Sequence, residues 1–184
     1  YNRAIEFSKD KMLPFKKLQI EKESTKIEDF LYQEPTIDEI GEKININTLN
    51  TVNVEANIIS SYTQRDFIMN IDSSTVKENF KTYLDNNKEA IEKHLIKCFK
   101  QSYQEIIAIK KVGEEVVKIK KRDIKSICET KEAINNFQQE MERLKDLCVK
   151  FKQMHELIGR CKLDASNKIT IADELNQAPD LYEV

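Results

Sequence analysis

Glycine, proline and tryptophan are scarce in this sequence. Its 184 residues include three glycines, three prolines and no tryptophan. Tight turns depend on glycine and proline for their special backbone angles, so a chain with so few of them turns seldom. This argues against a compact enzyme, whose chain must fold back on itself many times. With 34% charged residues and a mean hydropathy of −0.59, the composition favours long helices instead.

The sequence also lacks an excess of one charge and a long apolar run. Its 30 basic and 32 acidic residues are interspersed and leave a net charge of −2. Without a basic face to neutralise phosphates, we expect no nucleic acid partner. No stretch reaches the ~20 apolar residues that cross a membrane, and the first residues lack a signal-peptide pattern, so we expect no transmembrane segment. Because the sequence begins with Tyr1 rather than Met, we expect it to be a portion of a longer protein.

No motif for catalysis, a cofactor or a metal is found. No glycine-rich phosphate loop or nucleophile motif occurs. Of the two histidines, His94 and His155, the second lies about two helical turns from each of two cysteines, too far to share an ion with them. The sequence therefore predicts no enzymatic activity, no cofactor and no metal. The cysteines follow no CxxC spacing, which predicts free thiols in a reducing, cytoplasmic compartment; they are Cys98, Cys128, Cys148 and Cys161.

The first 74 residues divide into two segments. Residues 1–33 are charged with scattered apolar side chains, and we expect a short helix from about Lys16 to Tyr32. Residues 34–74 are rich in Asn and Thr, and Asn depresses helix formation by competing for backbone hydrogen bonds. Apolar and polar residues alternate from Val52 to Ile58 as in a strand. Because an isolated strand is unstable in water, we predict an extended linker, or a peptide that adds to the surface of a partner.

Residues 75–159 are the predicted coiled-coil region. No proline interrupts them. The sequence Thr75-Val76-Lys77-Glu78 has the form of a capping box, which satisfies the first free N–H groups of a helix. At the other end, Gly159 is expected to close the helix, because glycine readily takes the left-handed conformation.

The tail, residues 160–184, carries apolar residues that suggest one more short helix. We expect this helix from Ile169 to Leu175. Proline lacks a backbone N–H, so Pro179 is expected to end it.

Apolar residues of the coiled-coil region follow a heptad pattern. From Ile127 to Ile158 the seam advances in alternating steps of three and four residues, the a/d pattern of a left-handed coiled coil. The same register continues back to Leu95, but a shift of one residue separates it from the stripe Phe80–Ile91. His155 lies on the seam, where a polar residue often selects register or partner. The predicted interaction seam consists of Phe80, Leu84, Ile91, Leu95, Phe99, Ile106, Ile109, Val116, Ile127, Ile134, Phe137, Met141, Leu144, Cys148, Phe151, His155 and Ile158.

The seam weakens between Gly113 and Asp123. Either the helix breaks, near Gly113 or at Lys120–Asp123, and folds into a hairpin, or it continues and changes partners along its length. The first 74 residues hold too few apolar side chains to cover so long a stripe, so we expect partner chains to cover it. The predicted fold is therefore all-α, with long helices in a coiled coil, a helical hairpin or a bundle with partner chains, preceded by an extended leader.

Part of the region resembles the N-terminal coiled-coil segments of rod subunits in vesicle-tethering complexes of the exocyst and GARP kind. The resemblance covers roughly 75–158, and it has no diagnostic motif. It implies a helical bundle with sister subunits, a role in capturing vesicles before fusion, and no catalytic residues. The residues that carry it are Asn79-Phe80-Lys81-Thr82-Tyr83-Leu84, Ile91-Glu92-Lys93-His94-Leu95, Phe99, Tyr103, Ile106 to Ile109, Lys121-Arg122-Asp123-Ile124-Lys125 and His155-Glu156-Leu157-Ile158.

These observations predict a non-catalytic scaffold subunit of a hetero-oligomeric helical assembly in vesicle tethering. The bulky seam residues Phe99, Phe137 and Phe151 suit a mixed bundle of different helices better than a symmetric dimer. Other helical subunits are the expected partners, and such a complex would bring the chain to a membrane surface peripherally. The alternative is a structural coiled-coil component of the cytoskeleton, kinetochore, cilium or an organelle. A third hypothesis is a self-contained helical domain, which would be a stable monomer.

Overall fold

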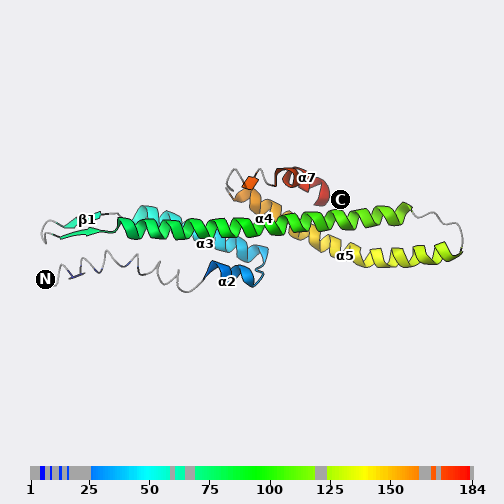
Figure 1. Ribbon diagram of the computed structural model, residues 1–184, viewed down its shortest axis with the longest axis horizontal. Coiled ribbons are helices and arrows are strands. Elements are labelled where there is room, and N and C mark those ends of the chain that lie inside the picture. The colour runs from blue at the N-terminus through cyan, green and yellow to red at the C-terminus, as the bar shows by residue number, and fades with distance from the viewer. Residues whose placement is uncertain are drawn as a thin grey trace. The chain divides into compact units, whose positions relative to one another are not determined.

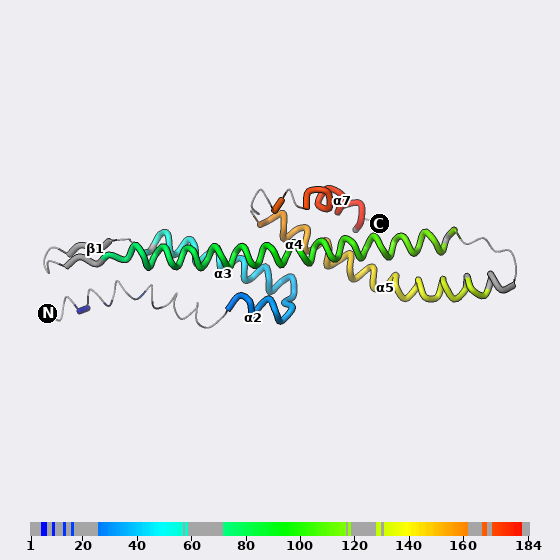
Figure 2. The backbone as a smooth tube through the Cα atoms, in the orientation of Figure 1, coloured from blue at the N-terminus to red at the C-terminus, as the bar shows by residue number. Residues whose placement is uncertain are grey.

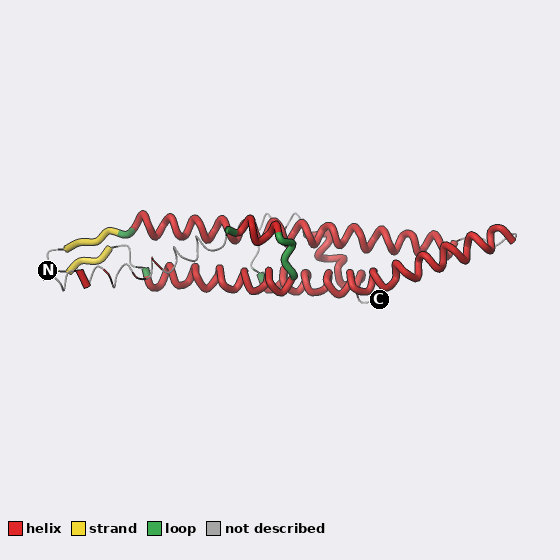
Figure 3. The backbone as a smooth tube through the Cα atoms, turned by 90° about the horizontal axis from the view of Figure 1, so that it is seen from below, coloured by secondary structure: helices red, strands yellow, loops and turns green. Residues whose placement is uncertain are grey.

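The computed structural model describes residues 5–6, 9, 13, 16, 26–58, 61–64, 69–118, 124–161, 167–168 and 171–182. Helices dominate these residues, with one short pair of strands (Figures 1 and 3), so the predicted all-α class is confirmed. The chain divides into two compact units, Tyr1–Glu92 and Lys93–Val184, and one long helix runs through the boundary. The elements are α2 (Ile27–Tyr32), α3 (Ile37–Asn57), β1 (Ser61–Gln64), β2 (Met69–Asp72), α4 (Ser74–Lys118), α5 (Ile124–Arg160) and α7 (Ala172–Tyr182).

Helix α3 occupies residues 37–57 of the segment for which an extended linker is predicted, so that prediction is wrong for these residues. A capping box starts the helix: the Glu39 N–H donates to Thr36 Oγ1 at 3.3 Å, and the Thr36 N–H donates to Glu39 Oε2 at 2.7 Å. These hydrogen bonds hold the pKa of Glu39 below its usual value. The strand-like alternation near Val54 lies inside this helix. Burial of one face of α3 outweighs the low helix propensity of its asparagines.

Two short strands lead into α4. Strands β1 and β2 pair antiparallel, with Ser61 opposite Asp72. The Asp72 carboxylate then accepts hydrogen bonds from the backbone N–H and the hydroxyl of Ser74, at 2.9 and 2.7 Å, and these lower the pKa of Asp72. Helix α4 therefore starts one residue before the predicted capping box at Thr75, and Asp72 supports its first turn.

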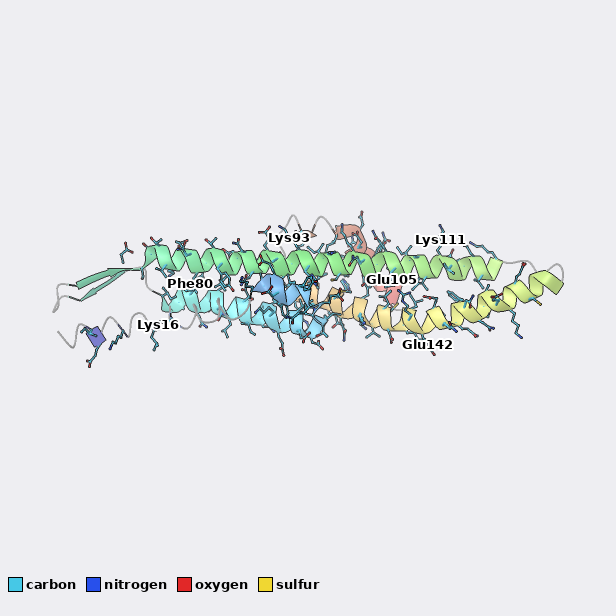
Figure 4. The ribbon with its side chains drawn as sticks, turned by 60° about the horizontal axis from the view of Figure 1, so that its bottom comes forward. Lys16, Phe80, Lys93, Glu105, Lys111 and Glu142 are labelled. Carbon is cyan, nitrogen blue, oxygen red and sulfur yellow. The ribbon has the colours of Figure 1, made fainter. Side chains whose placement is uncertain are left out.

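In the first unit, α3 packs antiparallel on the first half of α4. Four buried residues form the core between them: Val54, Ile58, Phe80 and Leu84. Figure 4 shows Phe80 directed from α4 toward α3. At the end of α3, the Lys77 ammonium donates to the Ile58 carbonyl at 2.6 Å and to the Glu55 carbonyl at 3.3 Å, which satisfies carbonyls that have no partner within the helix.

In the second unit, α4 and α5 form the hairpin that was one of the predicted alternatives (Figure 2). Helix α4 ends at Lys118 and α5 begins at Ile124, and these two helix ends flank the second of the two predicted places. Gly113 lies inside α4 rather than at the break. Its lack of a side chain admits the ring of Phe137, since a Cβ here would lie 2.9 Å from Cε2 and 3.2 Å from Cε1 of that ring.

The ends of the last helices differ from the prediction. Helix α5 includes Gly159, and none of the three described glycines has a positive φ, so the predicted left-handed closure is wrong. Helix α7 runs through Pro179. A proline removes one helical hydrogen bond near the end of this helix, and the full burial of Ile171 and Ala178 offsets that loss. At the N-terminus, α2 confirms a helix at Ile27–Tyr32, and most of the predicted helix before it lies outside the described residues.

Candidate protein interaction surface

The seam residues of the first unit are buried within the chain. Phe80, Leu84 and Ile91 are all less than a tenth exposed. Phe80 and Leu84 pack on Val54 and Ile58 of α3, a helix that the sequence does not predict. Partner chains are therefore not required to cover this part of the stripe, which corrects the expectation that they do.

A buried amide accompanies these apolar contacts. The side chain of Asn47 is buried in α3, and its Nδ2 donates to the backbone carbonyl of Leu84 at 3.0 Å. A buried polar group needs such a bond, because an unsatisfied one costs roughly 1–3 kcal/mol. The bond specifies how α3 is aligned with α4, since the amide must meet a carbonyl.

The seam residues of the second unit divide into a buried row and an exposed row. The rings of Phe99 and Phe151 are fully buried and stacked, with centroids 4.5 Å apart and planes at 15°. The side chain of Ile127 lies outside the described residues. Buried seam residues are Leu95, Phe99, Ile106, Ile109, Leu144, Phe151 and Ile158; half-buried ones are Val116, Phe137, Cys148 and His155; exposed ones are Ile134 and Met141.

Charged and aromatic groups flank the stacked rings. The ring of His155 lies 6.3 Å from that of Phe99, so this predicted register residue is at the edge of the core. On one flank of the hairpin, Arg143 of α5 pairs with Glu105 of α4, and Figure 4 shows Glu105 directed toward α5. Together with the contact between Gly113 and Phe137, these pairs fix an antiparallel register.

Helix α7 lies on the other flank of the hairpin and contacts both of its helices. On α4, Lys100 pairs with Glu174 at 3.7 Å and the Tyr103 hydroxyl donates to Gln177 Oε1 at 2.5 Å. On α5, the Cys148 thiol donates to the carbonyl of the α7 residue Leu181 at 3.6 Å. Burial raises the pKa of the Cys148 thiol, and the nearby Lys110 ammonium opposes that rise. The Cys148 thiol therefore stays protonated at neutral pH and acts as a packed side chain.

The outer face of α3 carries an apolar stripe that sequence reasoning missed. Ile46, Leu49 and Val52 are 51%, 60% and 55% exposed. They are spaced three residues apart, so neighbouring members of the set adjoin on the helix surface. We call these three residues the α3 stripe. Two signals in the sequence indicated this helix: the capping-box pair Thr36 and Glu39, and the seven-residue spacing from Ile40 to Asn47 and on to Val54.

Histidine and cysteine side chains come close together at one described place in the chain. His94 Nε2 lies 3.5 Å from the Cys98 thiol, one turn along α4. Within the described residues, no three histidine, cysteine or carboxylate side chains gather as a metal site would require. The described helices also include none that is both long and apolar enough to cross a membrane.

No protein-family model, curated protein or solved structure matches this chain. The candidate surfaces therefore rest on the residues of this chain alone. Of these surfaces, the α3 stripe is formed by three aliphatic side chains that are each more than half exposed.

Proposed function

We propose that this chain is a non-catalytic scaffold subunit of a hetero-oligomeric helical assembly, and that it binds a helix of a sister subunit through the α3 stripe. The observation that carries the proposal is the exposure of Ile46, Leu49 and Val52 on one face of α3. Single exposed aliphatic residues are ordinary on protein surfaces. A contiguous set on a helix is typical of a surface that another helix covers.

The other face of α3 supports this interpretation. Val54 and Ile58 are buried against α4, and the Asn47 amide is tied to the backbone of α4. The helix is thus anchored on one side and offers the opposite side in a defined orientation. A rigid, pre-oriented helix loses little conformational freedom on binding, and this favours affinity.

Vesicle tethering is the process that we propose for the assembly, on the strength of the sequence resemblance of residues 75–158. The arrangement of a long helix, α4, followed by a second helix, α5, agrees with the order of elements in the rod subunits of exocyst and GARP complexes. The segment before α4 departs from it, since α3 is a helix where that family has an extended leader. Helical subunits are the proposed partners, and any membrane contact would be peripheral.

The test compares two substitutions at one exposed position. Leu49→Asp places a charge in the α3 stripe, whereas Leu49→Met keeps the position apolar and about the same size. Because Leu49 is mostly exposed, both variants should keep the wild-type far-UV circular dichroism spectrum and Tm. Each full-length protein is then purified by affinity from its native cells, and the proteins that accompany it are identified and quantified by mass spectrometry.

We expect the wild type and Leu49→Met to retain a fixed stoichiometric set of large helical subunits, with small GTPases or SNARE proteins at lower yield. Leu49→Asp should lose that set at least in part. Equal recovery with Leu49→Asp would remove the α3 stripe from the binding surface. Filament, centromere or axoneme proteins in place of tethering subunits would refute the role in tethering, and a wild-type protein that purifies alone would refute the scaffold role.

A further inference from the structure

A second apolar surface continues the line of contacts that α7 makes with the hairpin. On α4, these contacts fall at Lys100 and Tyr103, and the next residue in that row, one turn on, is Ile107. On α5, the contact falls at Cys148, and the preceding residues at heptad spacing are Met141 and Ile134. Ile107, Met141 and Ile134 are 41%, 36% and 40% exposed. We call these three residues the uncovered edge.

The register of the hairpin places the α4 and α5 residues of the uncovered edge beside one another. Glu105 of α4 pairs with Arg143 of α5, and Gly113 admits Phe137. Ile107 and Met141 lie between these two cross-contacts on their helices, and they are therefore at nearly the same level. The uncovered edge is thus an extension of the surface on which α7 already packs.

The charges around the uncovered edge are mainly basic. Lys110 is close enough to Cys148 to affect the pKa of its thiol, and Lys145 follows Met141 by one turn and is exposed. Glu114, which follows Ile107 at heptad spacing on α4, pairs with Lys118 at 3.6 Å. The edge therefore favours a ligand with negative charge beside its apolar face.

Helix α7 itself has the chemistry that this surface accepts. It carries Asp173, Glu174 and Asp180 and no basic residue between Ala172 and Tyr182, and Glu174 pairs with Lys100. Its buried Ala178 supplies a small apolar contact. An acidic amphipathic helix is thus already bound on the first part of the same surface.

We propose that the uncovered edge binds an acidic amphipathic helix of a partner chain, which lies end to end with α7 between α4 and α5. A second copy of this chain is a poor occupant for its own edge, because Lys110 and Lys145 would face the same lysines of the other copy. The proposal does not depend on the α3 stripe, which belongs to the other unit of the chain.

The first experiment maps the occupant directly. A photo-crosslinking amino acid replaces Met141 in the full-length protein in its native cells, and the crosslinked peptides are sequenced by mass spectrometry. The matched control places the same amino acid at Val149, which is exposed on α5 but lies outside the edge. We expect position 141 to crosslink one peptide with aliphatic residues at helical spacing and net negative charge, and position 149 not to do so.

The second experiment tests the charge. Lys110→Glu and Lys145→Glu should each lower the yield of that crosslink roughly fivefold, since each reversal replaces an attraction at the rim of the interface by a repulsion. Lys150→Glu, on an exposed position of α5 away from the edge, should leave it unchanged. Equal Tm values for the lysine variants and the wild type will show that folding is intact.

Several results would overturn the proposal. These are a basic or apolar crosslinked peptide, a peptide from a second copy of this chain, equal crosslinking at 141 and 149, or no effect of the two charge reversals. Because the α3 stripe is unaltered in all these variants, loss of crosslinking with retention of the sister subunits would separate this proposal from the proposed function.

Discussion

Replacement of Gly113 by alanine tests the register of the hairpin between α4 and α5. Two opposing effects decide its sign. In a helix interior, alanine is more favourable than glycine by about 1 kcal/mol. At this site, however, the new Cβ would lie 2.9 Å from Cε2 and 3.2 Å from Cε1 of the Phe137 ring, and overpacking of this kind costs typically 1–3 kcal/mol. We expect the overpacking to exceed the gain in propensity, so that Gly113→Ala destabilises the chain by about 1 kcal/mol.

Gly159 provides a matched control in the partner helix. It also lies inside a helix, and nothing lies within 4 Å of the position that its Cβ would occupy. Gly159→Ala should therefore stabilise the chain, by up to about 1 kcal/mol since it is close to the helix end. The free energy of unfolding of each variant is measured by urea denaturation followed by far-UV circular dichroism.

A double-mutant cycle then isolates the contact itself. In a Phe137→Ala background the ring is gone, so Gly113→Ala should stabilise by about 1 kcal/mol as in any helix. The coupling energy between the two positions should be about 2 kcal/mol, well above the ~0.5 kcal/mol of independent sites. Additive effects, or equal stabilisation by Gly113→Ala and Gly159→Ala, would show that Phe137 does not pack on Gly113 and that the register is wrong.

Three further predictions concern the cores and the start of α3. Phe151→Ala removes a fully buried, stacked ring and should lower the free energy of unfolding by about 3–5 kcal/mol in urea titrations, whereas Phe151→Leu should cost much less. Asn47→Asp replaces the donor to the Leu84 carbonyl by a buried carboxylate; its Tm should fall well below that of the wild type at neutral pH and approach it as acidification protonates the new side chain. Thr36→Ala removes the cap of α3 and should cost about 1 kcal/mol in the same titrations. Thr36 holds the pKa of Glu39 below its unfolded value, so the ionised Glu39 carboxylate stabilises the folded wild type. This stabilisation is lost as the pH falls through the folded pKa of Glu39. The Tm of Thr36→Ala should therefore fall less than the Tm of the wild type over this pH range.

The second helix of the hairpin could be predicted from the sequence because its signal is local. The heptad spacing from Ile134 to Ile158 places one buried face on α5, and Leu144, Phe151 and Ile158 are buried as the pattern requires. The exposed position of Met141 was not predictable in the same way. Heptad spacing gives the a and d positions the same weight. Which of these positions on α5 is covered depends on where α7 packs.

The composition of residues 37–57 argues against helix α3, whereas the capping box at its start indicates the helix. Its many asparagines lower helix propensity, yet Thr36 and Glu39 form a capping box of the same type as the one predicted at Thr75 and Glu78. Recognition of that box would have indicated a helix with Ile40, Asn47 and Val54 on one face. The apolar residues of that face would then be expected to cover Phe80 and Leu84, so that no partner chain is needed there.

The one-residue shift in the stripe of α4 also has a structural counterpart. The shift falls between Ile91 and Leu95, and the boundary between the two compact units falls at Glu92 and Lys93. Phe80 and Leu84 pack on α3, whereas Phe99 packs on α5. The seam of α4 thus changes phase where its partner changes. Of the two alternatives predicted for the weak part of the seam, the hairpin is the one found, because α5 packs back on α4.

In both units the alignment of the helices depends on residues that contribute little apolar packing to a helix interface. Rows of Leu, Ile and Phe tolerate a slip of one heptad, since another apolar residue replaces the first. A slip of seven residues in the hairpin could instead bring Phe137 against Ile106 of α4, whose side chain would occupy the space that Gly113 leaves for the ring. In the first unit, a slip would move the buried Asn47 amide away from the carbonyl that it satisfies, at a cost of roughly 1–3 kcal/mol. A glycine and an asparagine therefore set the two registers, and the aliphatic residues supply the burial that makes each register stable.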